Sequence, residues 1–139
     1  EKNGPPPEVN LFNEKNNGES ILNLIDKGYV KSAHDISLGG LLVAISKMCI
    51  KGNKGIKINK SKNLINEIEY FFAEDQGRYL IEVNKEDLKE VTKILNKNSV
   101  HHEELGIITQ KDMIINEKTK VTIDELKSYY TSWLSKYMS

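Results

Sequence analysis

Cysteine is nearly absent from this sequence, and long apolar runs and an excess of either charge are absent altogether. Cys49 is the only cysteine, so the chain cannot form an internal disulfide, which suits a reducing, cytoplasmic compartment. No apolar run approaches the roughly 20 residues that a membrane-spanning helix needs, and the first ten residues lack the apolar segment of a signal peptide. The 20 acidic residues balance the 20 basic ones, which argues against binding nucleic acid or a membrane surface through bulk charge.

Arginine is as scarce as cysteine. Arg78 is the only arginine among the 20 basic residues, and all the others are lysines. A guanidinium group can grip a carboxylate or a phosphate through two parallel hydrogen bonds, which an ammonium group cannot do. Arg78 is therefore either a position at which lysine does not suffice or a chance survivor in a composition rich in Lys, Asn and Ile. The residues alone leave both interpretations open.

A length of 139 residues fits one domain, and a hydrophobic fraction of 38% is enough for one core. We expect residues 1–10 to be an extended, Pro-rich lead-in from an earlier domain, and residues 11–139 to be the domain itself. Because the sequence begins with Glu1 and not with methionine, we expect it to be part of a longer polypeptide. Cys49 lies in the apolar helical pattern AISKMCI, which favours a core position over a nucleophile.

Apolar periodicity and turn residues predict alternating helices and short strands. The expected helices are 19–27, 39–51, 85–95 and 124–138, with a helical turn at 63–68, and the expected strands are 29–35, 56–59, 78–83 and two or three within 101–123. Gly28 is the expected stop of the first helix, and Asn84 is the expected cap of the helix at 85–95. The last helix carries an apolar stripe that comprises Leu126, Tyr129, Tyr130, Trp133, Leu134 and Tyr137. This order predicts an α+β or α/β layered domain with a mixed sheet.

The segment SAHDISLGG places polar side chains and two glycines where the first strand hands over to the buried helix. Asp35 or Ser37 can cap that helix, and Gly39 and Gly40 let the backbone approach a ligand closely. The free amides at a helix start favour an anion such as a phosphate. Strand-to-helix turns also use these residue types for purely structural reasons, and a lone His34 is more often a satisfied buried histidine than a base. Both interpretations remain open.

The segment EDQGR is the second polar cluster. Glu74 and Asp75 can bind a hard cation through oxygen or accept hydrogen bonds from Arg78, while Gly77 allows a turn into the next strand. If the sheet brings this loop close to residues 34–40, the two segments form one polar rim; otherwise the loop is an exposed connection with a local ion pair of little energetic weight. The adjacent histidines at 101–102 point to opposite faces of a strand and lack a third ligand at metal-site spacing, so we predict no metal site there.

Four segments carry a family resemblance: GPPPEVNL, SAHDISLGGLLVAISKM, FFAEDQGRYLIEV and IDELKSYYTSWL. Together, in this order and spacing, they resemble the C-terminal domain of the AIR-synthase-related family, in the form found in phosphoribosylformylglycinamidine synthases. The signature that they match is His-Asp-x-Ser-x-Gly-Gly, followed by a Phe-x-Glu-x-Gln-Gly-Arg loop. Leu38 departs from the family, whose members often have a small or polar residue there.

The resemblance implies a three-layer α/β/α fold and a role in an ATP-dependent ligase of purine biosynthesis. That enzyme converts formylglycinamide ribonucleotide and glutamine-derived ammonia to the amidine, with ATP and Mg²⁺. The resemblance places the catalytic histidine and the main Mg²⁺ carboxylates in an N-terminal ATP-binding domain, so this chain alone should be inactive. The implied partners are the ATP-binding domains of the same polypeptide, a glutaminase subunit or domain and the ribonucleotide, without nucleic acid or membrane.

The residues expected to face the ribonucleotide or nucleotide phosphate, or to dock the neighbouring domain, are His34, Asp35, Ser37, Gly39, Gly40, Glu74, Asp75, Gly77 and Arg78. Two alternatives stay open: another enzyme of the same superfamily, such as a selenophosphate, thiamine-phosphate or hydrogenase-maturation enzyme, and a non-enzymatic interaction module that shares the fold. The ligase hypothesis predicts an exposed polar rim with apolar surface nearby. The interaction-module hypothesis predicts a rim closed by internal hydrogen bonds.

Overall fold

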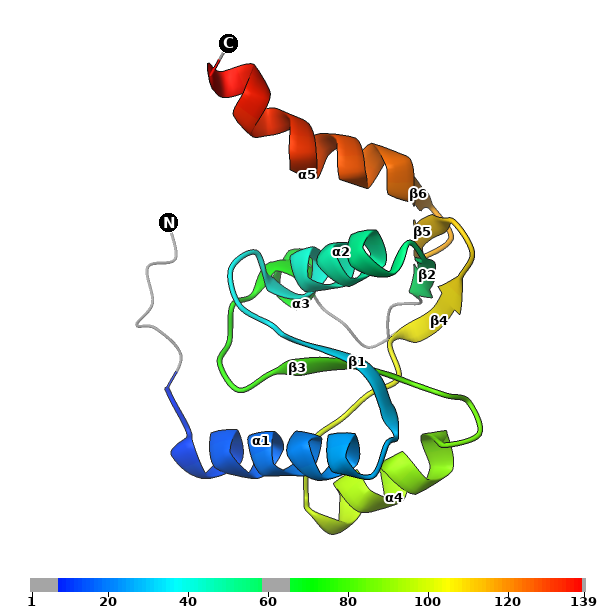
Figure 1. Ribbon diagram of the computed structural model, residues 1–139. Helices are drawn as coiled ribbons and strands as arrows, with labels where there is room; N and C mark the ends of the chain where they lie inside the picture. Colours follow the sequence, from blue (N-terminus) through cyan, green and yellow to red (C-terminus); the bar gives the residue numbers. More distant parts are fainter. Residues whose placement is uncertain (1–7, 59–65, 139) are drawn as a thin grey trace. The chain divides into compact units, whose positions relative to one another are not determined.

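The computed structural model of the chain describes residues 8–58 and 66–138. The elements follow in the order α1 (Leu11–Asp26), β1 (Val30–Asp35), α2 (Gly40–Gly52), β2 (Gly55–Ile58), α3 (Glu67–Phe72), β3 (Tyr79–Val83), α4 (Leu88–Lys97), β4 (Gly106–Thr109), β5 (Asp112–Ile115), β6 (Thr119–Thr122) and α5 (Ile123–Met138) (Figure 1). Most of the predicted lead-in, and the first half of the helical turn predicted at 63–68, lie outside the described residues. Within the described residues, no helix is both long enough and apolar enough to cross a membrane.

The chain forms two compact units, each built from two separate stretches. The first unit comprises Glu1–Ala44 and Phe71–Glu103, and the second comprises Ile45–Tyr70 and Glu104–Ser139. The boundary between the units falls within α2 and again within α3. The domain boundary predicted at residue 11 stays a prediction.

In the first unit, β1 and β3 pair as a two-stranded antiparallel sheet (Figure 1). Its core is built from Leu24 of α1 and from Val91 and Leu95 of α4, each no more than 5% exposed. The partly buried residues packed against this core are Tyr29, Val30, Ile81, Val83, Ile94 and Val100. A two-stranded ribbon is marginal by itself, so the packing of these helices stabilises it.

In the second unit, four strands form a sheet in the order β4-β2-β5-β6, and β2 runs parallel to β5 while the other pairs are antiparallel. The predicted mixed sheet and α+β class are therefore confirmed. The sequence did not predict the second sheet, in which β1 and β3 pair only with each other among the described residues. Strand pairing depends on contacts between residues far apart in sequence, which periodicity does not report.

Helix α1 begins at Leu11 and is longer than the predicted helix at 19–27. Its first half is rich in asparagine, which has a low helix propensity. Asn10 caps the helix by accepting a hydrogen bond from the Asn13 amide at 3.0 Å. Asn16 and Asn17 donate to the carbonyls of Asn98 and Gly77, at 2.7 and 3.0 Å. The local sequence pattern does not predict a helix for these residues, and tertiary hydrogen bonds stabilise the helix that they form.

Helix α4 begins at Leu88 and not at Lys85, and Asp87, not Asn84, occupies its cap position. Asn84 closes a turn just before the helix: its carbonyl accepts from the Asp87 amide at 3.1 Å, and its side chain donates to the Asp87 carboxylate at 3.0 Å. The predicted cap was therefore wrong by one turn.

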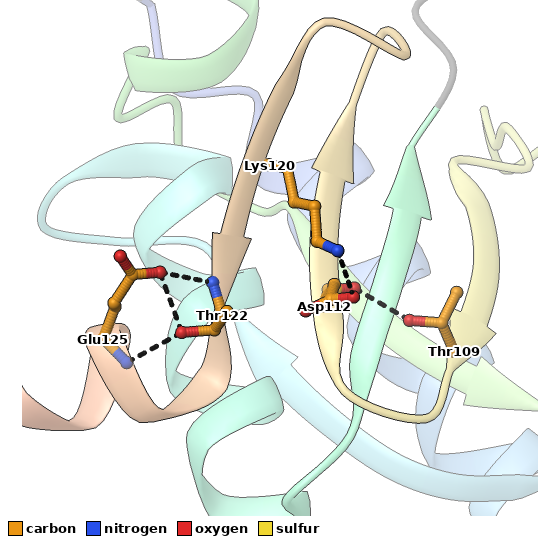
Figure 2. A network of polar contacts seen from close by, with 5 residues as sticks. All are labelled: Thr109, Asp112, Lys120, Thr122 and Glu125. Atoms are coloured by element: carbon orange, nitrogen blue, oxygen red, sulfur yellow. Dashed lines mark hydrogen bonds and ion pairs between the residues drawn. The ribbon is translucent and has the colours of Figure 1, made fainter.

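Helix α5 begins at a capping box formed by Thr122 and Glu125 (Figure 2). The Glu125 carboxylate accepts from the Thr122 amide at 2.9 Å, and the Thr122 hydroxyl accepts from the Glu125 amide at 3.2 Å. The Thr122 hydroxyl also donates to the Glu125 carboxylate at 2.8 Å, and the two hydrogen bonds that this carboxylate accepts from Thr122 lower the pKa of Glu125. Nearby, the Asp112 carboxylate forms an ion pair with the Lys120 ammonium at 2.9 Å (Figure 2). The Asp112 main-chain carbonyl accepts a hydrogen bond from the Thr109 hydroxyl at 2.8 Å. The first turn of α5 is therefore fixed at the end of β6.

Cys49 is buried, as its place in an apolar helical pattern predicts. Burial raises the pKa of the thiol to about 11, and the thiol must ionise to act as a nucleophile. We therefore expect no labelling by iodoacetamide at pH 8 in the folded protein and complete labelling in guanidinium chloride, followed by mass spectrometry. Rapid labelling of the folded protein would show that Cys49 is accessible and ionised.

Candidate functional site

The turn between β1 and α2 is built on two consecutive glycines in the left-handed region. Gly39 has a φ of 84° and Gly40 a φ of 68°. The Gly40 amide donates to the Ser37 carbonyl at 2.9 Å, which closes the turn. A Cβ on Gly40 would lie 2.7 Å from the Cα of Phe72, at the end of α3. The sequence suggests that the backbone of the two glycines approaches a ligand closely. In the structure the backbone of Gly40 instead lies close to the end of α3.

Glu74 caps the backbone of this turn through the Gly39 amide. Its Oε1 accepts a hydrogen bond from the Gly39 amide at 2.7 Å, and its side chain is otherwise exposed. The sequence predicts Asp35 or Ser37 in this capping role; the structure gives the amide contact to Glu74, which comes from a loop distant in sequence. An anion from outside the chain would meet a carboxylate already seated there, and two charges about 4 Å apart repel by roughly 1 to 4 kcal/mol near a protein surface.

Arg78 closes the loop that carries Glu74. Its Nη1 donates to the Ala73 carbonyl at 3.3 Å and to the Asp75 carboxylate at 3.4 Å, and 30% of its side chain is exposed. Its own carbonyl accepts from the Ile36 amide at 2.9 Å, which extends the β1–β3 pairing by one step. A single nitrogen, Nη1, thus ties Arg78 back to Ala73 and Asp75 and closes the EDQGR loop.

Gly77 joins the same loop to α1. It has a φ of 68°, and a Cβ there would lie 3.0 Å from the Cγ of Glu14. Its carbonyl accepts from the Asn17 side chain at 3.0 Å. The two predicted segments, 34–40 and 74–78, are adjacent, because the Gly39 amide bonds to Glu74 and the Ile36 amide bonds to the Arg78 carbonyl. We call these two segments the polar rim.

His34 and Asp35 lie at one end of the rim. The Nδ1 of His34 is 2.6 Å from the main-chain carbonyl of Asp35 and 3.3 Å from its carboxylate. A carbonyl oxygen only accepts, so Nδ1 carries a proton, and in the neutral ring Nε2 is left as an acceptor. Both residues border an open hollow of about 340 Å³. The residues that line it are Ile21, Ala33, His34, Asp35 and Tyr79.

Apolar side chains stand exposed beside the rim. Leu38, at the tip of the turn, is 79% exposed, and Phe72 and Tyr79 are 50% and 41% exposed. The rim itself is tied by internal hydrogen bonds, yet the side chains of Asp35, Ser37 and Glu74 remain exposed. The arrangement combines the exposed polar and apolar surface expected of a domain interface with part of the internal closure expected of an interaction module.

The described residues do not fit a magnesium site. They include no group of three or more His, Cys, Asp and Glu side chains that could hold a metal ion. Within the EDQGR loop, Asp75 pairs with Arg78 and Glu74 with a backbone amide, so these carboxylates already have partners. At the histidine pair, Nδ1 of His102 lies 2.9 Å from the Val100 carbonyl.

Sequence comparison defines the class. Residues 1–116 match the family described as AIR synthase related protein, C-terminal domain. The chain belongs to this family.

Among curated proteins, the chain is 62% identical over 138 residues to "Phosphoribosylformylglycinamidine synthase subunit PurL" of Pelagibacter ubique, which covers 99% of this chain and 19% of the relative. It is 40% identical over 131 residues to the protein of the same name from Caldanaerobacter subterraneus, which covers 94% of this chain and 18% of the relative. The chain thus spans about a fifth of the length of these relatives.

Among solved structures, the fold is similar to that of Thermotoga maritima PurL complexed with FGAR, with a TM-score of 0.73 and 21% identity over 85% of this chain and 21% of that one. The structure of PurLQS from the same organism gives a TM-score of 0.75 and 20% identity over 86% of this chain and 22% of that one. These likenesses confirm the predicted AIR-synthase C-terminal fold.

Proposed function

We propose that this chain is a domain of a PurL-type phosphoribosylformylglycinamidine synthase. The observation that carries the proposal is the 62% identity to a curated PurL across 99% of the chain. The whole enzyme would convert formylglycinamide ribonucleotide, ATP and ammonia to the amidine, and the remaining four-fifths of the polypeptide would hold ATP, Mg²⁺ and the catalytic groups. A glutaminase partner would supply the ammonia, and the complex would work in the cytoplasm.

Within that enzyme, the polar rim would dock the neighbouring domain and border the ribonucleotide site. The residues concerned are His34, Asp35, Ser37, Gly39, Gly40, Glu74, Asp75, Gly77 and Arg78. Two features favour docking over direct phosphate binding. The Gly39 amide already donates a hydrogen bond to Glu74, and Leu38 and Phe72 offer exposed apolar surface beside it. The chain would position substrate through its neighbour and would contribute no catalytic residue.

A chimera tests this function. The segment of Pelagibacter ubique PurL that matches this chain is replaced by it, and amidine formation is measured with ATP, Mg²⁺ and either ammonium or glutamine plus a glutaminase partner. We expect activity within about tenfold of the unmodified enzyme, and none from the chain alone. A chimera that folds and binds ATP but forms no amidine would contradict the proposal, and the unmodified enzyme is the control.

Replacement of Arg78 by lysine should lower the activity of this chimera about tenfold while the midpoint of urea unfolding stays nearly unchanged. A lysine side chain is shorter than arginine and does not place a donor where Nη1 of Arg78 reaches both Ala73 and Asp75. The Arg78–Asp75 pair is long and partly exposed, so its loss costs little stability, whereas a small displacement of a positioning loop can cost roughly tenfold or more in rate. The matched control is Lys31→Arg, at an exposed position of β1. Equal activity at equal stability would refute a special role for the guanidinium.

A further inference from the structure

Helix α5 carries an exposed aromatic face that nothing in the described residues covers. The sequence has ten aromatic residues, and four of them, including the only tryptophan, lie between positions 129 and 137 of α5. The exposed apolar side chains of this stretch are Tyr129, Tyr130, Trp133, Leu134, Tyr137 and Met138. Exposure ranges from 50% at Leu134 to 83% at Tyr137, so this is not the usual scatter of single apolar residues.

The spacing of these residues is that of a helix that inserts into a groove. Tyr130, Trp133, Leu134 and Tyr137 stand at positions i, i+3, i+4 and i+7, which places them on one face of the helix. Tryptophan and tyrosine are also the residue types that most often dominate binding energy at interfaces. The opposite face carries small polar residues such as Ser128 and Thr131.

The contacts that fix the beginning of the helix are well defined. The capping box of Thr122 and Glu125 fixes the first turn, Ile123 is 4% exposed, and the Lys127 ammonium donates to the Asn53 side chain at 2.7 Å. Beyond Lys127 the described side chains are exposed except that of Ser132. The helix is therefore preformed at its base, while the aromatic side chains of its second half are exposed.

We propose that the aromatic face of α5 docks into an apolar groove on the remainder of the same polypeptide. This inference rests on the proposed function. The family match ends at residue 116, before α5, whereas the PurL relative aligns over 138 residues of the chain. The helix is thus shared with PurL proteins beyond the part that defines the wider family, and about four-fifths of that relative lies outside this chain.

The size of the face favours docking within one polypeptide over a dimer. Four large side chains that are roughly half exposed or more offer on the order of 500 Å², which is below the roughly 800 Å² per partner of a stable intermolecular interface. Within one polypeptide, the effective concentration of the groove reaches the millimolar range, so a smaller face suffices.

Hydrogen exchange in the intact parent polypeptide tests the proposal. An isolated helix end exchanges quickly because short helices are marginal in water. We expect the amides of 128–138 to exchange at least 100-fold more slowly than in an unstructured chain, at all protein concentrations. Trp133→Lys should accelerate their exchange at least tenfold, and Ser128→Lys, which adds the same charge on the opposite face, should not; peptides from α1 and α4 report whether each variant is folded.

Exchange of 128–138 close to the unstructured rate would overturn the proposal, and protection that disappears on dilution would overturn it in favour of a second copy. Cross-linking of the unaltered protein gives an independent result, since Lys127 and Lys136 flank the face. Cross-links from Lys136 to lysines elsewhere in the same polypeptide support the proposal, and cross-links found only between isotopically distinct copies contradict it. Each of these results is independent of amidine formation by the chimera, so the two proposals can fail separately.

Discussion

Gly40→Ala should destabilise the first unit by roughly 3 kcal/mol or more. An L-residue in the left-handed region costs about 1 to 2 kcal/mol, and Gly40 has a φ of 68°. The added Cβ would also lie 2.7 Å from the Cα and carbonyl carbon of Phe72 and 2.8 Å from the Phe71 carbonyl oxygen. Because backbone atoms cannot move aside as a flexible side chain can, the overlap adds a further cost of about 1 to 3 kcal/mol.

Gly28→Ala is the matched control for this prediction. Gly28 has a φ of 76°, and a Cβ there would meet nothing within 4 Å, so only the backbone strain of about 1 to 2 kcal/mol applies. Urea unfolding followed by circular dichroism gives both free energies. If the two substitutions cost the same, the close approach between Gly40 and Phe72 carries no energy, and the turn is not shaped by packing on α3.

Leu24→Ala should destabilise the protein by about 3 kcal/mol. Leu24 is fully buried between α1 and α4, against Val91 and Leu95. Truncation of a buried leucine costs about 2 to 5 kcal/mol, because it combines the lost transfer free energy with a cavity that the surroundings only partly fill. The effect should appear in the same urea experiment as a lower midpoint with an unchanged slope.

The control for Leu24 lies on the same helix. Leu22 is 61% exposed, so Leu22→Ala removes the same atoms with a change of no more than about 0.5 kcal/mol. A similar loss from both substitutions would show that helix propensity, and not the core of the first unit, sets the cost. A larger loss from Leu22→Ala would mean that the exposed face of α1 is covered in solution.

Much of the candidate site is legible in the sequence, because its signals are local. The pair Gly39-Gly40 indicates a turn with left-handed backbone angles, which both residues adopt, since glycine enters the left-handed region without strain. The strand before them and the helix after them follow from apolar patterning, and both are confirmed within a residue or two. The family motif predicts which segments matter. The role of the rim stays a prediction.

The polar contacts of the site are not local, and the sequence did not reveal them. The Gly39 amide meets Glu74, and the Asn17 side chain meets Gly77, across long separations in the chain. Nothing in the neighbourhood of Ser37 distinguishes a turn capped by its own residues from one capped by a distant carboxylate. The start of α1 was missed for the same reason, since its asparagines form a helix only in the presence of their tertiary partners.

The sequence by itself determined the order of helices and strands, the burial of Cys49, the glycine turn and the family, because each depends on neighbouring residues or on a motif. Only the tertiary structure decided that the strands divide into two sheets, that Glu74 accepts a hydrogen bond from the Gly39 amide and that the aromatic face of α5 is exposed. The physical reason is that pairing, capping from a distance and burial are properties of surfaces brought together by folding. A local pattern encodes which surfaces exist, and folding selects which of them meet.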